Sequence, residues 1–224
     1  MKSKKSAPLA WLFLPLWLIL YGLILFADAP VDMYSAFSSI VLCFAYGLFR
    51  GKKTDPWMLA ALACTLCADY CLVLCGREQR LLGMVFFLGV QSFYGIRLHL
   101  WAKSKILWIA RILLILAAMG AALLVLGENV DALALISLCY YANLICNIVA
   151  SFTRFSKNPL LPIGFVLFAV CDTVIGLQVM SESYIPLAAD SWLRQVLFVD
   201  INLPWLFYLP SQVLLALGSG RERS

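Results

Sequence analysis

The chain has 224 residues, of which 63% are hydrophobic and 13% are charged, and its formal net charge is +5. With a mean hydropathy of +0.92, it has too little polar surface to cover a soluble globule. The composition therefore excludes a water-soluble domain and predicts an integral membrane protein.

Short polar segments divide the chain into eight apolar stretches. A helix needs about 20 apolar residues to cross the hydrocarbon core, and each stretch has about that length. In chain order, the predicted spans are approximately 9–27, 33–49, 57–75, 81–101, 106–126, 132–152, 160–181 and 196–218. Backbone polar groups in lipid are satisfied only in helices or closed barrels. We therefore expect residues 1–224 to form a single all-α transmembrane domain, a polytopic bundle of eight helices.

The basic residues between the spans predict the orientation of the bundle. If the N-terminus is cytoplasmic, only Arg77, Arg80 and Arg194 fall in outer segments. The twelve basic residues of the inner segments are Lys2, Lys4, Lys5, Arg50, Lys52, Lys53, Lys103, Lys105, Arg154, Lys157, Arg221 and Arg223. This bias follows the positive-inside rule, so we expect both termini to be cytoplasmic, in a bacterial cytoplasmic membrane. The net positive charge is thus a topology signal, and we expect no nucleic-acid partner.

Three acidic residues fall inside the predicted spans. Asp69 and Asp172 each lie about 12 residues from the inner end of their helix, so at 1.5 Å per residue both lie about 18 Å from the inner boundary. Asp200 lies about one turn into the last span, within reach of the outer interface. A charged side chain at the bilayer centre costs roughly 2.5 to 3.5 kcal/mol. We therefore interpret the two deep aspartates as functional residues, against the alternative of neutral, hydrogen-bonded acids that only pack.

Other polar side chains can line a hydrated cavity beside these aspartates. On the sixth span, Tyr140, Asn143, Asn147 and Arg154 fall within a sector of about 60°. The candidate ligand-binding residues are Gln91, Tyr94, Tyr140, Asn143, Asn147, Arg154, Asp200, Tyr208 and Gln212. The alternative for the amides and tyrosines is hydrogen bonding between helices, and for Arg154, as for Arg97 and His99, it is snorkelling to the interface.

The eight cysteines all lie in predicted spans. Cys64, Cys67, Cys71 and Cys75 fall on one stripe of the third span, within about 80°. Metal ligation would need deprotonated thiols in lipid and further ligands from elsewhere, so we interpret the stripe as helix packing. The sequence has no zinc signature, and we expect no metal and no cofactor. It carries no signal for an oligomeric state.

The aspartates suit acid-base chemistry better than a nucleophilic triad. A neutral carboxylic acid can donate a proton, and an ionised carboxylate beside it can accept one, so the two together can catalyse proton transfer at neutral pH. Ser-His and Cys-His pairs are poorly supported, because the only histidine, His99, lies near the inner boundary. Asp69 and Asp172 are therefore the candidate catalytic residues.

Several ordered sequence blocks are similar to those of a known family. They are Ala68-Asp69, the glycine-rich and aromatic stretch 83–94, Phe168 to Asp172 as Phe-Ala-Val-Cys-Asp, and Tyr208 to Gln212 as Tyr-Leu-Pro-Ser-Gln. Their order, with eight spans, resembles the lysoplasmalogenase family, also called YhhN-like. The chain departs from the family pattern at Gln91, where the family has histidine, and at Cys171, where it has serine. The second span also lacks the lysine that the family often carries there.

The resemblance implies hydrolysis of the vinyl-ether bond of a lysoplasmalogen, giving a fatty aldehyde and a glycerophospho-headgroup. Such cleavage begins with protonation of an alkenyl carbon and passes through an oxocarbenium ion, as glycosidic cleavage does. Asp69 and Asp172 would be acid and base, and Arg154 is placed to meet a phosphate from the inner side. The implied partner is a lysophospholipid or other single-chain lipid among the membrane lipids. The alternative is a non-enzymatic lipid or small-amphiphile binder or transporter that uses the same cavity.

Overall fold

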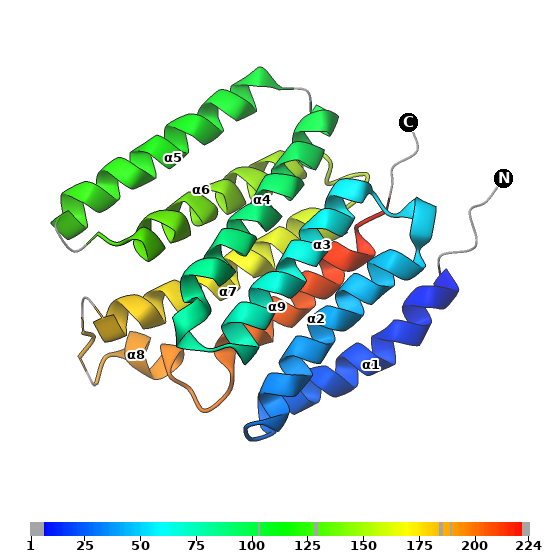
Figure 1. Cartoon of the computed structure of the whole chain (residues 1–224), viewed down its shortest axis with the longest axis horizontal. Helices are drawn as coiled ribbons and strands as arrows, with labels where there is room; N and C mark the ends of the chain where they lie inside the picture. The colour runs from blue at the N-terminus through cyan, green and yellow to red at the C-terminus, as the bar shows by residue number, and fades with distance from the viewer. Residues whose placement is uncertain (1–6, 103, 128–129, 184–185, 189, 221–224) are drawn as a thin grey trace.

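The computed structural model describes residues 7–102, 104–127, 130–183, 186–188 and 190–220, and its regular elements are all helices (Figure 1). The α-helices are α1 (Ala7–Phe26), α2 (Val31–Phe49), α3 (Pro56–Asp69), α4 (Arg80–Ala102), α5 (Lys105–Leu126), α6 (Ala132–Phe152), α7 (Leu160–Ser183), α8 (Trp192–Leu197) and α9 (Leu203–Leu217). The shorter elements are the 3-10 helices η1 (Gly51–Lys53) and η3 (Arg77–Gln79) and the π-helix η2 (Tyr70–Leu74).

Seven helical stretches in the described part of the chain are long and apolar enough to cross a membrane. They are α1, α2, α3 continued by η2, α4, α5, α6 and α7, and they correspond to the first seven predicted spans. The protein is therefore an all-helical membrane protein. The cytoplasmic placement of its termini stays a prediction from the charge distribution.

Polar residues between the spans begin the next helix. Asp55 accepts a hydrogen bond from the backbone of Trp57 and precedes Pro56, which occupies the first position of α3. Ser104 caps α5 in the same way, and Asp131 caps α6 by accepting from Ala134. Such caps satisfy backbone N–H groups that have no partner within the helix. The polar residues that divide the apolar stretches therefore also fix where three of the helices start.

The last predicted span begins too early. The prediction of 196–218 treats the segment as one helix, but α9 begins only at Leu203, after the separate short helix α8. Pro204 lies in the first turn of α9, where its ring fits, and a proline disfavours helical backbone in the residue before it. The 15 residues of α9 are fewer than the roughly 20 that a membrane-crossing helix needs. An eighth complete crossing therefore stays a prediction.

The third helix changes its hydrogen-bonding pattern directly after Asp69. The backbone N–H of Cys75 donates to the carbonyl of Tyr70 over 3.1 Å, which is the five-residue spacing of a π-helix. The prediction that four cysteines share one stripe rests on a rotation of 100° per residue up to Cys75. Because the helix is not α-helical after Asp69, that assumption is wrong for Cys71 and Cys75. Cys71 is buried, whereas Cys67 and Cys75 are exposed.

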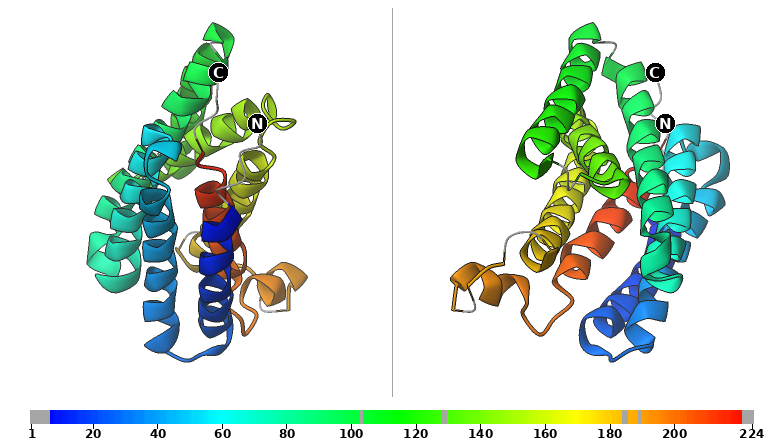
Figure 2. Two further views of the ribbon diagram at one scale, coloured as in Figure 1. Left: turned by 90° about the vertical axis from the view of Figure 1, so that its right-hand side faces the viewer. Right: turned by 60° about the vertical axis from the view of Figure 1, so that its left-hand side comes forward.

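The contacts between helices place α9 inside the bundle and α5 at its edge. α9 packs against α7, α2 and α1, while α4 packs against α3 and α6. α5 packs against α6 and forms one border of the molecule in the ribbon views (Figures 1 and 2). Much of its outer face is apolar and exposed, as Leu113 and Leu124 illustrate. In a bilayer this face is the one that meets lipid tails.

One end of the bundle collects segments that are far apart in sequence. Thr54 pairs with Gly220 through the backbone, and Arg97 at the end of α4 donates to the carbonyl of Gly220 over 2.8 Å. Asn158 donates to the carbonyl of Gly218 over 2.9 Å. We call this the Gly220 end; α1 begins there and α9 ends there (Figure 2). This arrangement agrees with the alternating direction of the predicted spans.

Candidate functional site

Asp69 is the last residue of α3 before the π-helical turn, and its side chain is only 3% exposed. The hydroxyl of Tyr208 on α9 donates to its Oδ2 over 2.7 Å. A buried carboxyl group needs such a partner, because burial removes the water that would otherwise solvate it. Two residues from the predicted site, drawn from distant segments, are therefore in direct contact.

Asp172 on α7 is held in a similar way. It is half-buried on α7, and the hydroxyl of Tyr140 on α6 donates to its Oδ2. The next residues along both helices form a second link, in which the hydroxyls of Tyr141 and Thr173 share a hydrogen bond of 2.7 Å on an exposed face. The two aspartates thus have the same kind of partner, a tyrosine on a neighbouring helix.

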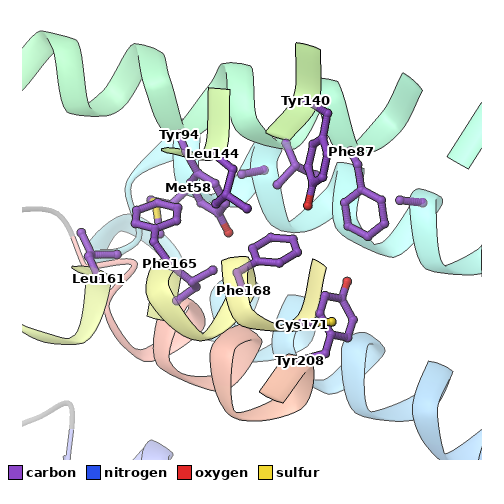
Figure 3. Close-up of a cluster of buried hydrophobic side chains, with 14 of the residues drawn as sticks. Met58, Phe87, Tyr94, Tyr140, Leu144, Leu161, Phe165, Phe168, Cys171 and Tyr208 are labelled. Atoms are coloured by element: carbon purple, nitrogen blue, oxygen red, sulfur yellow. The ribbon is translucent and has the colours of Figure 1, made fainter. Parts of the chain in front are cut away.

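A group of four aromatic rings joins the two aspartate-tyrosine pairs. Phe87 lies 5.6 Å from Tyr140 and 6.3 Å from Tyr208 between ring centroids. Phe168 lies 6.3 Å from Tyr140 and 5.5 Å from Tyr208. The tyrosine hydroxyls point toward one another across this group (Figure 3). Each carboxyl group accepts from a tyrosine of this group, Asp69 from Tyr208 and Asp172 from Tyr140. We call these four rings and two carboxyls the aspartate-aromatic cluster.

A second polar network connects α4, α5 and α6. Nη1 of Arg111 donates to Oδ1 of Asn143 over 2.8 Å, and Nη2 donates to Oδ1 of Asn147 over 2.7 Å. Nδ2 of Asn147 in turn donates to the side-chain and backbone oxygens of Gln91, both at 2.8 Å. The structure therefore brings together three predicted binding residues, Gln91, Asn143 and Asn147, around an arginine.

Arg111 is the residue that the sequence interpretation missed. It lies in the middle of an apolar helix and is 8% exposed. The candidate residues inside the predicted spans are acidic, amide or tyrosine residues and basic residues near span ends, and Arg111 is not among them. A survey of basic residues within the 106–126 span would have found it, since a buried guanidinium is as costly in lipid as a carboxylate.

Tyr94 and Gln212 are fully buried but are not linked to the aspartates by a hydrogen bond. Within the described residues, the hydroxyl of Tyr94 and both polar atoms of the Gln212 side chain have no hydrogen-bond partner. The ring of Tyr94 packs edge-on against Phe165 at 5.0 Å. These two predicted binding residues therefore belong to the interior of the bundle.

Two predicted binding residues lie away from the aspartate-aromatic cluster. Arg154 lies in the turn after α6, beyond the last helical residue Phe152. The prediction that Asp200 lies inside the last span is wrong, because it is exposed in the segment between α8 and α9. The late start of α9 at Leu203 explains this position.

No group of three metal-ligating side chains comes together in the part of the chain that the structure describes.

The arrangement is suited to proton transfer between two carboxyl groups and a molecule held between them. Each carboxyl keeps one oxygen on a tyrosine hydroxyl, which fixes its orientation and leaves the other oxygen for chemistry. The aromatic rings cover part of the space beside the carboxyls, and the face of a ring also attracts a cation. A general acid and a general base can therefore operate from opposite sides of this cluster.

Comparison with known proteins gives one match. No curated protein and no solved structure matches the chain. Residues 31–219 match the model of the YhhN family, and this range includes both aspartate-tyrosine pairs and the network around Arg111. The resemblance inferred from the sequence blocks is confirmed: the chain belongs to the YhhN family.

Proposed function

We propose that the protein is a membrane-embedded hydrolase that cleaves the vinyl-ether bond of a lysoplasmalogen-type lysolipid. Membership of the YhhN family suggests a lysoplasmalogenase-like function. The observation that carries the proposal is the meeting of two carboxyl groups, each held by a tyrosine, at one aromatic cluster. The alkenyl chain of the substrate would lie among the aromatic rings, with its ether oxygen toward the carboxyls.

The proposed reaction uses one carboxyl as acid and the other as base. The protonated carboxyl delivers its proton to the β-carbon of the vinyl ether, which leaves an oxocarbenium ion at the carbon bonded to oxygen. Water attacks that carbon while the second carboxylate accepts a proton from the water. The resulting hemiacetal breaks its carbon–oxygen bond to release the fatty aldehyde and the glycerophospho-alcohol. As the hemiacetal collapses, the first carboxylate takes its hydroxyl proton and the second carboxyl protonates the departing oxygen. One water molecule is consumed, and one carboxyl ends protonated and the other ionised, as at the start.

The surroundings of the carboxyls support this sequence of steps. The rings of Phe87 and Phe168 lie against each other and against both tyrosines, so their faces can stabilise the developing cation. Tyr140 and Tyr208 hold the carboxyls in place, which reduces the reorganisation needed in the transition state. The roles of acid and base are not assigned to particular aspartates.

The test is aldehyde release by the purified protein from a 1-alkenyl lysophospholipid. Asp69→Asn and Asp172→Asn preserve shape but remove the ionisable carboxyl, so each is expected to lower the rate at least about 100-fold. Asp28→Asn, at an exposed position before α2, is the matched control and is expected to keep the full rate. Absence of turnover by the unmodified protein, or equal rates in all variants, would disprove the proposal.

Substrate analogues test the bond that is cleaved. A lysolipid with a saturated alkyl ether cannot be protonated at carbon, so we expect it to bind without reaction. An acyl lysolipid is also expected to remain intact. Release of fatty acid from the acyl compound, with no aldehyde from the alkenyl compound, would replace the proposal with an ester hydrolase.

A lipid-binding or transport function is the second candidate, and the position of Gln91 favours it. Where the family pattern has histidine, this chain has an amide that is fully buried and already bonded to Asn147. An amide can hold a ligand but cannot carry a proton as imidazole does. This candidate predicts that the alkenyl lysolipid raises the unfolding temperature in neutral detergent while no aldehyde forms.

A further inference from the structure

The guanidinium of Arg111 on α5 holds α6 at two positions. Its Nη1 donates to Oδ1 of Asn143 and its Nη2 donates to Oδ1 of Asn147, and all three side chains are buried. Among the described residues, no carboxylate lies within ion-pair distance of Arg111. A buried guanidinium without an anion costs free energy that an apolar side chain of similar length would not cost. Its presence therefore needs an explanation other than stability.

The same guanidinium also lies against α4. Nδ2 of Asn147 donates to the backbone and side-chain oxygens of Gln91, both over 2.8 Å. A Cβ built on Gly95 would lie 2.4 Å from Nη1 of Arg111, so the guanidinium packs directly on the backbone of α4, where glycine leaves room for it. Three helices therefore meet at one charged group, which α5 supplies and which α4 and α6 hold.

The faces of α4 and α6 that meet at Arg111 are the faces that enter the aspartate-aromatic cluster. On α4, Phe87, Gln91 and Gly95 are spaced four residues apart and lie within about 80° of one another. On α6, Tyr140 lies within about 60° of the two asparagines. Phe87 and Tyr140 pack 5.6 Å apart between ring centroids, about one turn from the network on each helix. A rotation of either helix that moved its ring would therefore also break the network.

We propose that Arg111 is a positioning residue, which fixes the rotation of α4 and α6 and so directs the hydroxyl of Tyr140 at Asp172. Tyr140 donates to Oδ2 of Asp172 across the boundary between α6 and α7. Arg111 bonds to the asparagines of α6 rather than to a carboxyl, so its effect on the reaction passes through these helices. The inference rests on the proposed function, because it gives Arg111 a role in that reaction.

A charged clamp suits this role better than apolar packing does. Lipid tails compete with apolar contacts between helices in a membrane, so such contacts alone hold a helix rotation weakly. Two hydrogen bonds from one planar guanidinium restrict the orientation of their acceptors much more. Misplacement of a catalytic group by about 1 Å can lower a rate about 100-fold. The network thus supplies the precision that the bond between Tyr140 and Asp172 needs.

Steady-state aldehyde release by two variants is the first test. Arg111→Met removes the donors at a similar length. Gly95→Ala keeps every hydrogen-bonding group but displaces the guanidinium, whose flexible end can move without loss of the fold. We expect kcat to fall about tenfold or more in both variants, with KM changed less than about twofold, because the groups that meet the substrate are retained.

Gln178→Leu is the control for a loss of stability alone. It removes a hydrogen bond between α7 and α8, outside both the network and the aspartate-aromatic cluster. We expect it to lower the unfolding temperature and to keep the original kcat. If Gln178→Leu lowered kcat as much as Arg111→Met at an equal loss of stability, the positioning role would be contradicted.

A double-mutant cycle with Tyr140→Phe shows whether Arg111 acts through that hydroxyl. We expect Arg111→Met to lower kcat less than about twofold once Tyr140→Phe is present, because the group that it directs has already been removed. In the Tyr208→Phe protein the loss should keep its full size, since Tyr208 holds the other carboxyl. Losses that multiply in both backgrounds would show that Arg111 only stabilises the fold, and would overturn the inference.

Infrared spectroscopy measures the position of Tyr140 without catalysis. At acidic pH, the carboxyl stretching band that disappears in Asp172→Asn reports the hydrogen bonding of that carboxyl. We expect Arg111→Met and Gly95→Ala to shift this band in the direction in which Tyr140→Phe shifts it. An unmoved band in both variants would disprove the role of Arg111. A shifted band in a protein that releases no aldehyde would retain that role and remove the hydrolase.

Discussion

The hydroxyl of Tyr208 donates to Oδ2 of Asp69 over 2.7 Å, across 139 positions of sequence. Tyr208→Phe removes this hydrogen bond without changing the ring that packs against Phe168 and Trp205. We expect the variant to lose about 1 to 3 kcal/mol of stability, because it leaves a buried carboxyl without its donor. Aldehyde release should fall about tenfold or more, mainly in kcat. Unchanged kinetics would show that Asp69 needs no orientation by Tyr208.

Tyr140→Phe and Tyr141→Phe form a matched pair on α6. The first removes the donor to Asp172, and the second removes an equivalent hydrogen bond to Thr173 on an exposed face. We expect Tyr140→Phe to lower aldehyde release about tenfold or more and Tyr141→Phe to leave it near the original rate. Steady-state assays on both purified variants make the comparison. Equal losses would indicate that the tyrosines act by joining α6 to α7.

Gln212→Leu should stabilise the protein. The side chain is fully buried, and neither of its polar atoms has a hydrogen-bond partner among the described residues. Replacing an unsatisfied amide with an apolar group of similar size is expected to add about 1 to 2 kcal/mol of stability. Thermal unfolding in detergent, followed by tryptophan fluorescence, measures the change.

Gln178→Leu is the control for that prediction. Nε2 of Gln178 donates to the carbonyl of Leu197 over 2.7 Å and so links α7 to α8. Its replacement should lower the unfolding temperature, the opposite sign to Gln212→Leu. A loss of stability in both variants would mean that Gln212 has a partner of its own in the membrane-embedded protein.

Gly83→Ala should destabilise the contact between α4 and the π-helical turn. An added Cβ would meet Cγ of Leu72 at 2.6 Å, and overpacking of this kind costs about 1 to 3 kcal/mol. Gly120→Ala on α5 is the control, because nothing lies within 4 Å of its added Cβ. There the substitution should add roughly 0.5 to 1 kcal/mol through better helix propensity. If both variants changed the unfolding temperature by the same amount and in the same direction, the predicted clash at Gly83 would be contradicted.

Much of the site could be predicted from periodicity alone. Tyr140, Asn143 and Asn147 repeat at intervals of three and four residues, and all three face partners inside the bundle. Asp69 and Asp172 each bond a tyrosine of the same aromatic cluster, and their equal membrane depth, inferred from helix rise, stays a prediction. The face on which a residue lies is a local property of a straight helix, which is why residue spacing alone indicates it.

The predictions that were wrong or incomplete concern features that a hydropathy pattern does not indicate. Residues 196–202 continue the apolar run, yet Pro204 fixes the start of α9 at Leu203 and leaves Asp200 outside it. The π-helical turn depends on how α3 packs against α2 and α4, so the sequence of α3 alone did not reveal it. Arg111 itself is visible as a basic residue inside an apolar span, but its partners lie on α6, which no spacing within α5 can indicate.

The π-helical turn after Asp69 divides the helix into two parts whose side-chain faces are rotated relative to each other about the helix axis. A turn that holds one extra residue carries the following side chains about 100° away from where an uninterrupted α-helix would place them. Asp69 keeps its alignment with Tyr208, while Tyr70 just beyond it meets Phe37 on α2 at 6.1 Å. The part of the helix beyond Asp69 can therefore change its neighbours through substitution without turning the carboxyl away from its tyrosine.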